Sequence, residues 1–274
     1  MSSAPRAIHP GFLPTQGTSR AFVWKYTPVY WGRRPRHFHV EPELNLIASG
    51  SATFGVGDGV VRVGRGDLIG FSPAQDHVLL EASPDLYLFA IGMAPELSLE
   101  ILRGTATVGT LPLHLHLDPE DFRRLVNRAS EVVDRDGVEQ PCAELWEQAH
   151  WLGQRHAATR AHVLTRRALA AVSQSPDLGL QALAGELRTA GSEISRYFRR
   201  DMGLPFARYR TRLRLLRLMG LMDGGGTTLG AAAEASGFGS YSQCHRTFQA
   251  ELGCSPRRFF HAGLRTQMQQ VFDP

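Results

Sequence analysis

Residues 237–259 read GFGSYSQCHRTFQAELGCSPRRF, and they decide the architecture of the C-terminal part of the chain. The small residues just before them, in TTLGAAAEASGF, predict a short helix that ends at Gly237 in a left-handed cap. Ser240 is a good N-cap for a second helix that begins directly after it. Two short helices joined by a tight turn form a helix-turn-helix, whose second helix can enter the major groove of DNA.

The same pattern occurs earlier in the chain. In LQALAGELRTAGSEISRYFRRDMG, residues 180–203, apolar side chains recur with helical spacing in two short runs. Arg196 on the second run lies 50 residues before Arg246. The residues between the two units, 205–226, predict one long connecting helix. The C-terminal part therefore contains an internal repeat of a DNA-reading unit.

The charge of the chain is divided unevenly between its halves. Residues 1–161 hold 15 Lys and Arg against 18 Asp and Glu, whereas residues 162–274 hold 15 Arg against 8 acidic residues. A basic half joined to a mildly acidic half indicates that one half meets a polyanion. The alternative is an arginine-rich face that only contacts solvent.

The N-terminal half has a different pattern. Residues 21–93 alternate short apolar runs with glycines and prolines, which is typical of an all-β barrel or sandwich. Within this region His37 and His39 alternate along one predicted strand, so their side chains point to the same face. Glu43 follows four residues later, and His77 lies on a facing segment.

No stretch of the chain approaches the roughly 20 apolar residues of a membrane span, and the first residues lack the apolar core of a secretory signal. The cysteines are odd in number and lack metal-ligand spacing, at Cys142, Cys244 and Cys254. This pattern favours free thiols in a reducing cytoplasm. We expect a cytoplasmic protein with no membrane contact.

Residues 162–263 resemble the DNA-binding domain of the AraC/XylS family. The resemblance rests on Gly-Phe at 237–238, the serine four residues on, Arg246-x-Phe, and the closing Gly-x-Ser-Pro-x-x-Phe at 253–259. It implies base contacts from eight residues on the two second helices: Ser192, Ser195, Arg196, Tyr241, Ser242, Gln243, His245 and Arg246.

Arginine bound to guanine is the commonest specific contact to a base, so Arg196 and Arg246 rank first among these residues. We interpret Arg199, Arg200 and Arg257 as phosphate contacts, which position a protein on DNA without reading its sequence. The chain departs from the family at two positions. Ala190 stands where the family usually has a capping Ser or Thr, and Cys244 stands where a bulky aromatic residue is common.

The N-terminal motifs resemble those of the cupin barrel, in which two His, a Glu and a further His hold a divalent metal. The resemblance implies a site for one divalent metal ion made by His37, His39, Glu43 and His77. Imidazole and carboxylate ligands suit Zn, Fe, Ni or Cu. Two alternatives stay open: a polar network that holds nothing, and direct contact with an organic effector.

Two predicted helices join the halves. In EQPCAELWEQAHWLGQRHA, residues 139–157, Trp146 and Trp151 lie partly off the main apolar stripe, which makes this helix a candidate homodimer interface. Packing of both side chains within the domain is the alternative. We therefore expect an α+β multidomain chain. It consists of a cupin-like sensor barrel (1–110), a linker with dimerisation helices (111–160) and an all-α domain of two helix-turn-helix units (161–274).

These features predict a sequence-specific transcription regulator that binds double-stranded DNA and responds to a small-molecule or metal effector in the barrel. RNA polymerase is a further candidate partner. One alternative is a metal-dependent cupin enzyme with a helical appendage. Another is a protein that coats DNA without sequence preference. The double helix-turn-helix favours the regulator over the enzyme, and the different polar residues on the two second helices favour it over the coating protein.

Overall fold

The computed structural model describes residues 9–10, 20–28, 35–101, 113–133, 139–157 and 161–261. The N-terminal half is built from short strands, as the sequence predicts. The strands are β1 (His9–Pro10), β2 (Ala21–Tyr26), β3 (His37–Phe38), β4 (Glu43–Ser49), β5 (Ser51–Val56), β6 (Gly59–Gly64), β7 (Asp67–Phe71), β8 (His77–Ala82), β9 (Tyr87–Met93) and β10 (Leu113–His116).

The strands form two five-stranded sheets. One has the order β1-β3-β8-β5-β6 and the other the order β10-β7-β4-β9-β2. Apart from the parallel pair β1–β3, neighbouring strands are antiparallel. Strand β4 lies at the centre of the second sheet, and its first five residues are buried, with Leu44 and Leu46 on one face and Glu43, Asn45 and Ile47 on the other. The N-terminal half is therefore the expected β-barrel-like domain.

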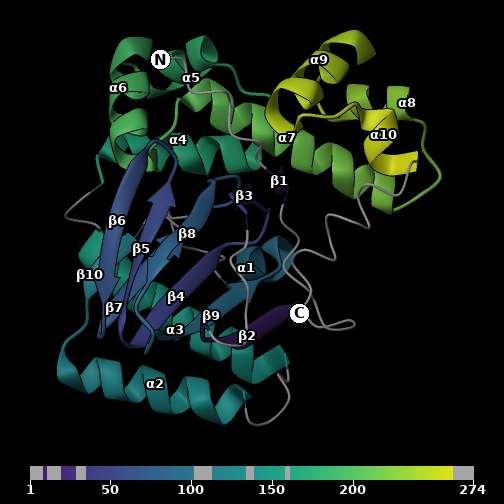
Figure 1. The fold of residues 1–274 in the computed structure, drawn as a ribbon. Helices are drawn as coiled ribbons and strands as arrows, with labels where there is room; N and C mark the ends of the chain where they lie inside the picture. The colour runs from purple at the N-terminus through teal and green to yellow at the C-terminus, as the bar shows by residue number, and fades with distance from the viewer. Residues whose placement is uncertain are drawn as a thin grey trace, which may run out of the picture.

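Three helices accompany the sheets: α1 (Pro95–Ile101), α2 (Pro119–Val133) and α3 (Glu139–Ala157). Asp118 caps α2, because its carboxylate accepts hydrogen bonds from the backbone N–H groups of Glu120 and Asp121. Helix α3 packs against β2, β4, β9 and β10 (Figure 1). Trp146 on this helix is fully buried, whereas Trp151 remains 37% exposed. Trp146 thus packs inside the domain, which leaves only Trp151 at the face predicted for dimerisation.

The described part of the C-terminal half, residues 161–261, contains helices and no strands, and it lies beside one end of the sheets (Figure 1). Its helices are α4 (Val163–Gln174), α5 (Leu180–Leu187), α6 (Gly191–Met202), α7 (Phe206–Asp223), α8 (Leu229–Ala235), α9 (Tyr241–Leu252) and α10 (Pro256–His261). Helices α5 and α6 form the first unit, and α8 and α9 form the second. Helix α7 runs between them as the predicted connecting helix. Within the described part of the chain, none of the helices is both long and apolar enough to cross a membrane.

Candidate functional site

Helix α9 is the better-capped of the two second helices, which we call recognition helices. The hydroxyl of Ser240 accepts a hydrogen bond from the backbone N–H of Gln243 at 3.1 Å. In return the side-chain oxygen of Gln243 accepts from the backbone N–H of Gly239 at 2.8 Å. This reciprocal arrangement is close to a capping box, and it begins the helix at the position that the sequence predicts. It also turns the oxygen of Gln243 toward the backbone, while the side chain stays exposed, so its base contact stays a prediction.

The buried stripe of each recognition helix fixes which side chains face outward. Ile194, Phe198 and Met202 bury one side of α6, and Cys244, Phe248 and Leu252 bury the matching side of α9. The structure therefore brings the predicted base contacts to the opposite faces. Ser192, Arg196, Tyr241, Ser242, Gln243 and Arg246 are exposed, and Ser195 and His245 are half-buried.

Helix α6 begins without a side-chain cap. Ala190 occupies the N-cap position and has no capping hydrogen bond, and the exposed side chain of Ser192 does not take its place. Arg196 lies over the ring of Tyr197 at 4.6 Å, with Glu193 at 3.8 Å. A planar guanidinium held over an aromatic ring is already restricted, so it loses less conformational entropy when it binds a base.

The three predicted phosphate contacts have different surroundings. Arg257 is exposed on α10. Arg199 forms an ion pair of 3.1 Å with Asp58, which belongs to the barrel. Arg200 donates to Asp201 at 2.6 Å, and Asp201 also accepts from the hydroxyl of Thr165. Two of the three arginines thus already have a carboxylate partner in this structure.

The predicted metal ligands come together between the two sheets. His37 in β3 pairs directly with His77 in β8, and Glu43 is the first residue of β4 in the other sheet. The Nε2 atom of His39 lies 3.1 Å from a carboxylate oxygen of Glu43, and Nε2 of His77 lies 3.8 Å from the same oxygen. All four side chains are buried.

The backbone fixes how the three imidazole rings point. Each Nδ1 atom lies within hydrogen-bond distance of a carbonyl oxygen: Pro35 for His37, Glu41 for His39 and Gln75 for His77. A carbonyl oxygen can only accept, so each Nδ1 carries a proton and donates it. Nε2 of His39 then faces the carboxylate of Glu43, and Nε2 of His77 faces the cluster without a hydrogen bond to any described residue. This is the orientation in which a backbone contact holds a histidine for a metal ion.

Burial and charge act differently on the four groups. Burial lowers the pKa of His77 to about 4 and that of His37 well below its usual value, with the neighbouring histidines adding to the shift of His37. Burial also works to lower the pKa of His39, but the hydrogen bond and charge of Glu43 outweigh it and raise that pKa. The pKa of Glu43 is lowered, because its bonds to His39 and Asn45 and the charge of His77 overcome the cost of burial. The cluster is therefore one anionic carboxylate surrounded by imidazoles.

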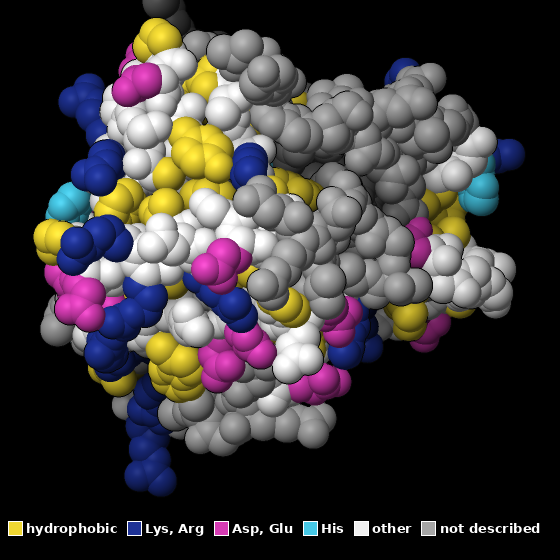
Figure 2. All heavy atoms as spheres, turned by 90° about the horizontal axis from the view of Figure 1, so that it is seen from below, with side chains coloured by type: hydrophobic (Ala, Val, Ile, Leu, Met, Phe, Trp, Pro, Cys, Tyr) yellow, Lys and Arg dark blue, Asp and Glu magenta, His cyan; other side chains and the backbone are white. Residues whose placement is uncertain are grey.

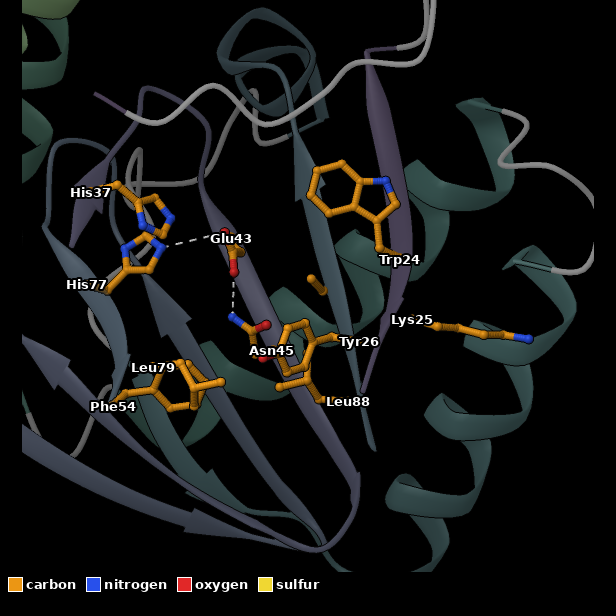
Figure 3. A pocket seen from close by; sticks show the side chains of 11 residues that line it. Trp24, Lys25, Tyr26, His37, Glu43, Asn45, Phe54, His77, Leu79 and Leu88 are labelled. Carbon is orange, nitrogen blue, oxygen red and sulfur yellow. Dashed lines mark hydrogen bonds and ion pairs between the residues drawn. The ribbon is translucent and has the colours of Figure 1, made fainter. Parts of the chain in front are cut away.

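A cavity of about 80 Å³ opens beside the cluster (Figure 3). His37, His77 and Glu43 form its polar end, together with Asn45, whose amide donates to Glu43 at 2.6 Å. Its other walls are mostly apolar and come from both sheets: Trp24, Lys25, Tyr26, Phe54, Leu79, Leu88 and Ala90. In Figure 3 the chain of Lys25 extends away from the other side chains. The cavity can hold a small, largely apolar molecule with a polar group at one end.

Sequence reasoning missed Asn45 and the aromatic wall of the cavity. Asn45 lies two residues after Glu43 on the same strand, so alternation alone would have placed both side chains on one face. Trp24 and Tyr26 show the same alternation along β2. No sequence pattern linked them to the histidines, because β2 joins the site only through the order of the strands in the sheet.

The face of the molecule around α2 has a different character. Figure 2 shows acidic and basic side chains mixed over this face rather than gathered by sign. On α2 Arg124 pairs with Glu120 at 2.7 Å, and Arg128 pairs with Glu144 of α3 at 2.8 Å. A surface that neutralises its own arginines offers little attraction to a polyanion.

Two protein families match the chain, over separate stretches. The AraC-like ligand binding domain matches residues 27–171, and a helix-turn-helix domain matches residues 183–262. A search of curated proteins found no match.

Solved structures of regulators are similar over much of the chain. ToxT from Vibrio cholerae O395 is 14% identical, with a TM-score of 0.46, over 88% of this chain and 96% of that one. Unsaturated fatty acid bound wild-type ToxT from Vibrio cholerae strain SCE256 is 13% identical, with a TM-score of 0.46, over 90% of this chain and 97% of that one. The AraC-like transcriptional activator CuxR is 17% identical, with a TM-score of 0.29, over 72% of each chain.

The ligand-domain family covers more than half of the chain. The helix-turn-helix family spans nearly all of the two helix-turn-helix units. The chain therefore belongs to the AraC family of transcription regulators, with an N-terminal ligand-binding domain and a C-terminal helix-turn-helix DNA-binding domain.

Proposed function

We propose that this regulator reads a specific DNA sequence with both recognition helices, α6 and α9. The observation that carries the proposal is the equivalence of Arg196 and Arg246. They lie 50 residues apart at corresponding positions of two similar helices, and both side chains are exposed opposite a buried apolar stripe. Each is suited to a bidentate contact with guanine in its own major groove.

The test begins by selecting a preferred site from random DNA with the full chain. Arg246→Ala is expected to weaken binding to that site by about 1–3 kcal/mol and to relax the preference at one base pair. Arg123→Ala removes the same charge from the exposed face of α2 and serves as the control, with little change. An unchanged sequence preference in Arg246→Ala would show that α9 does not read DNA.

We further propose that the barrel cluster holds one divalent first-row metal ion through His37, His39, Glu43 and His77. Nε2 of His77 supports this assignment, because it is buried and has no hydrogen-bond partner among the described residues. The histidine ligand atoms lie within 4.8 Å of one another. Ligands of one ion at about 2.1 Å stand no more than about 4.2 Å apart, so the rings need to close only slightly. A bound ion would supply a Lewis-acidic anchor for an oxygen or nitrogen atom of an effector in the cavity.

Elemental analysis of protein purified without chelator, before and after reconstitution, tests the metal site. We expect close to one ion per chain, lost in His77→Ala and retained in His114→Ala, which changes a partly exposed histidine that pairs with Asp67 outside the cluster. Metal content near zero in the reconstituted wild type would leave the cluster as the polar end of an effector pocket. In that case an effector would contact His37, His77 or Glu43 directly.

The same cluster beside a cavity is the observation that favours the alternative function, a metal-dependent cupin enzyme with a helical appendage. The two recognition helices give an enzyme no advantage, so we assign the cavity to sensing. Turnover of a candidate substrate by the metal-loaded protein, with no effect of that substrate on DNA binding, would reverse this assignment.

The remaining proposals concern organisation and partners. We assign sensing to residues 1–110, linking and dimerisation to 111–160 and DNA binding to 161–274, in a cytoplasmic homodimer that works with RNA polymerase. The exposed ring of Trp151 supports α3 as the dimer contact. Analytical ultracentrifugation of the full chain at tens of micromolar tests this. A monomer there would remove the dimer, and Trp151→Ala should weaken it.

A further inference from the structure

The barrel contacts the first helix-turn-helix unit at the C-terminal end of its recognition helix. The backbone N–H of Asp58, in the turn between β5 and β6, donates to the carbonyl oxygen of Gly203 at 2.7 Å. The side-chain amide of Gln75 donates to the carbonyl oxygen of Met202 at 2.8 Å. The last carbonyls of a helix have no partner within the helix, so the barrel satisfies two groups that α6 leaves open.

The turn at Asp58 also forms an ion pair with an arginine of α6. A carboxylate oxygen of Asp58 lies 3.1 Å from the guanidinium of Arg199. Carboxylate and phosphate oxygens bind a guanidinium in the same way, so Asp58 stands where a DNA phosphate would bind. Both side chains are largely exposed, so this ion pair adds little to the stability of the fold. Its effect is that Arg199 is not free to bind a phosphate while Asp58 holds it.

A second contact is fully buried and reaches further into the DNA-binding half. Arg212 on α7 is 0% exposed and pairs with Asp76 of the barrel. It also pairs with Glu251 of α9 at 3.1 Å, and its guanidinium lies 5.0 Å from the ring centre of Phe38. One buried arginine therefore ties the barrel, the connecting helix and the second recognition helix together.

Asp76 is held on both sides. One of its carboxylate oxygens binds Arg212 and the other binds Arg36 at 2.6 Å. A buried ion pair of this kind is costly to open, because separation would leave a charge without a partner. The barrel thus holds α7 in one position between the two helix-turn-helix units.

We propose that Asp58 and Asp76 form an interdomain clasp that restrains DNA binding. Asp58 occupies Arg199, and Asp76 fixes the position of α7 and, through Glu251, of α9. Opening the clasp frees Arg199 for phosphate and lets the two recognition helices adjust to successive grooves. The role of Arg199 rests on the proposed function, in which it contacts the DNA backbone.

The clasp also adjoins the barrel cluster. His77 follows Asp76 in the chain, and the ring of His77 donates to the carbonyl oxygen of Gln75, whose side chain holds Met202. A group that binds to His77 therefore lies next to Asp76 of the clasp and to Gln75, which holds the end of α6. This gives an occupant of the barrel a short route to both recognition helices.

The experiment measures DNA affinity of the full chain by fluorescence anisotropy over a range of salt concentrations. The variants are Asp58→Asn and Asp76→Asn, with Asp85→Asn as the control. Asp85 is exposed in the turn before β9, so its variant removes the same charge without touching the clasp. We expect Asp58→Asn to bind about three- to tenfold more tightly than Asp85→Asn, on the selected site and on random DNA alike.

The salt dependence gives a second readout. Freeing one phosphate contact should steepen the slope of log K against log salt by about 0.9 in Asp58→Asn, relative to Asp85→Asn. Asp76→Asn should also bind more tightly than the control. Equal affinity and slope in Asp58→Asn and Asp85→Asn would overturn the clasp, even where Asp76→Asn fails to fold. Wild-type protein that shows no sequence preference would overturn the proposed function instead.

Discussion

Gly203 and Gly253 end the two recognition helices with nearly the same backbone, at φ 71° and ψ 7° in α6 and φ 71° and ψ 5° in α9. Their surroundings are entirely different. A Cβ atom added to Gly203 would lie 2.9 Å from the carbonyl oxygen of Val56 in the barrel, whereas one added to Gly253 would meet no described residue within 4 Å. The two copies share the local structure of a helix-turn-helix, but among the residues that the structure describes the recognition helix of the first copy alone ends against the sensor domain.

The largest expected effect is a difference in stability between two variants of α7, one at a buried arginine and one at an exposed arginine. Arg212→Ala should lower the free energy of unfolding by about 3 kcal/mol, because it removes the buried cation that Asp76 and Glu251 share and leaves Asp76 with Arg36 and Glu251 with Arg208. Arg208 also pairs with Glu251, at 3.0 Å, but is 40% exposed, so Arg208→Ala should cost no more than about 1 kcal/mol. Denaturant unfolding measures both. Equal losses would show that Arg212 does not tie the halves together.

The next largest effect is on the pH dependence of stability, which should differ between the two halves. The described histidines of the DNA-binding half are not buried, whereas His150 on α3 is buried and stacks on Trp146 at 4.7 Å. Burial lowers the pKa of His150 to about 4, against 6.5 for an ordinary histidine. Between these values the unfolded chain binds more protons than the folded one. Stability should therefore fall as pH drops from about 6.5 to about 4, by about 3 kcal/mol from this residue.

His150→Phe keeps a flat ring against Trp146 and should remove that share of the pH dependence, measured by unfolding at pH 7 and pH 4.5. A His150→Phe variant with the pH dependence of the wild type would contradict the assignment.

Alanine at the two glycines tests the comparison itself. Gly253→Ala should lose about 1–2 kcal/mol, which is the cost of a left-handed backbone for a residue with a Cβ atom. Gly203→Ala should lose at least about 1 kcal/mol more, since its Cβ also presses on Val56 and displaces the barrel. Thermal unfolding of the two variants side by side gives the difference. Matching losses would mean that the barrel contact at Gly203 contributes nothing.

The smallest effect concerns the helix starts. Ser240 caps α9 and Ala190 leaves α6 uncapped. Ala190→Ser should raise the stability of the DNA-binding half by about 1 kcal/mol, and Ser240→Ala should lower it by a similar amount. Chemical denaturation followed by far-ultraviolet circular dichroism checks both. A Ser240→Ala variant as stable as the wild type would show that Gln243 alone suffices to begin α9.

The repeat was the part of the fold that the sequence predicted best. Helical spacing and the 50-residue offset are local properties of the chain, so they place α5, α6, α8 and α9 without any knowledge of packing. The cluster of His37, His39, Glu43 and His77 was predictable for a related reason. Its members lie on short motifs whose alternation sets the direction of each side chain.

The clasp was beyond sequence reasoning. Arg212 lies among several arginines on α7, and the helix pattern alone treats each of them as a surface residue. Its burial depends on Asp76 and Glu251, which come from distant parts of the chain. Trp146 shows the converse, because its place off the main apolar stripe suggested an interface, yet the sheet covers it. In both cases a neighbouring element decides whether the side chain is buried, and the spacing of residues along the helix does not reveal that element.

Guanine methylation interference on the selected DNA site tests the central claim most directly. Two recognition helices in successive major grooves should give two clusters of guanines whose methylation blocks binding, about 10 base pairs apart on one face of the DNA. Arg196→Ala should remove one cluster and Arg246→Ala the other. A single cluster, or two clusters that both survive each substitution, would contradict an account in which both helix-turn-helix units read the DNA sequence.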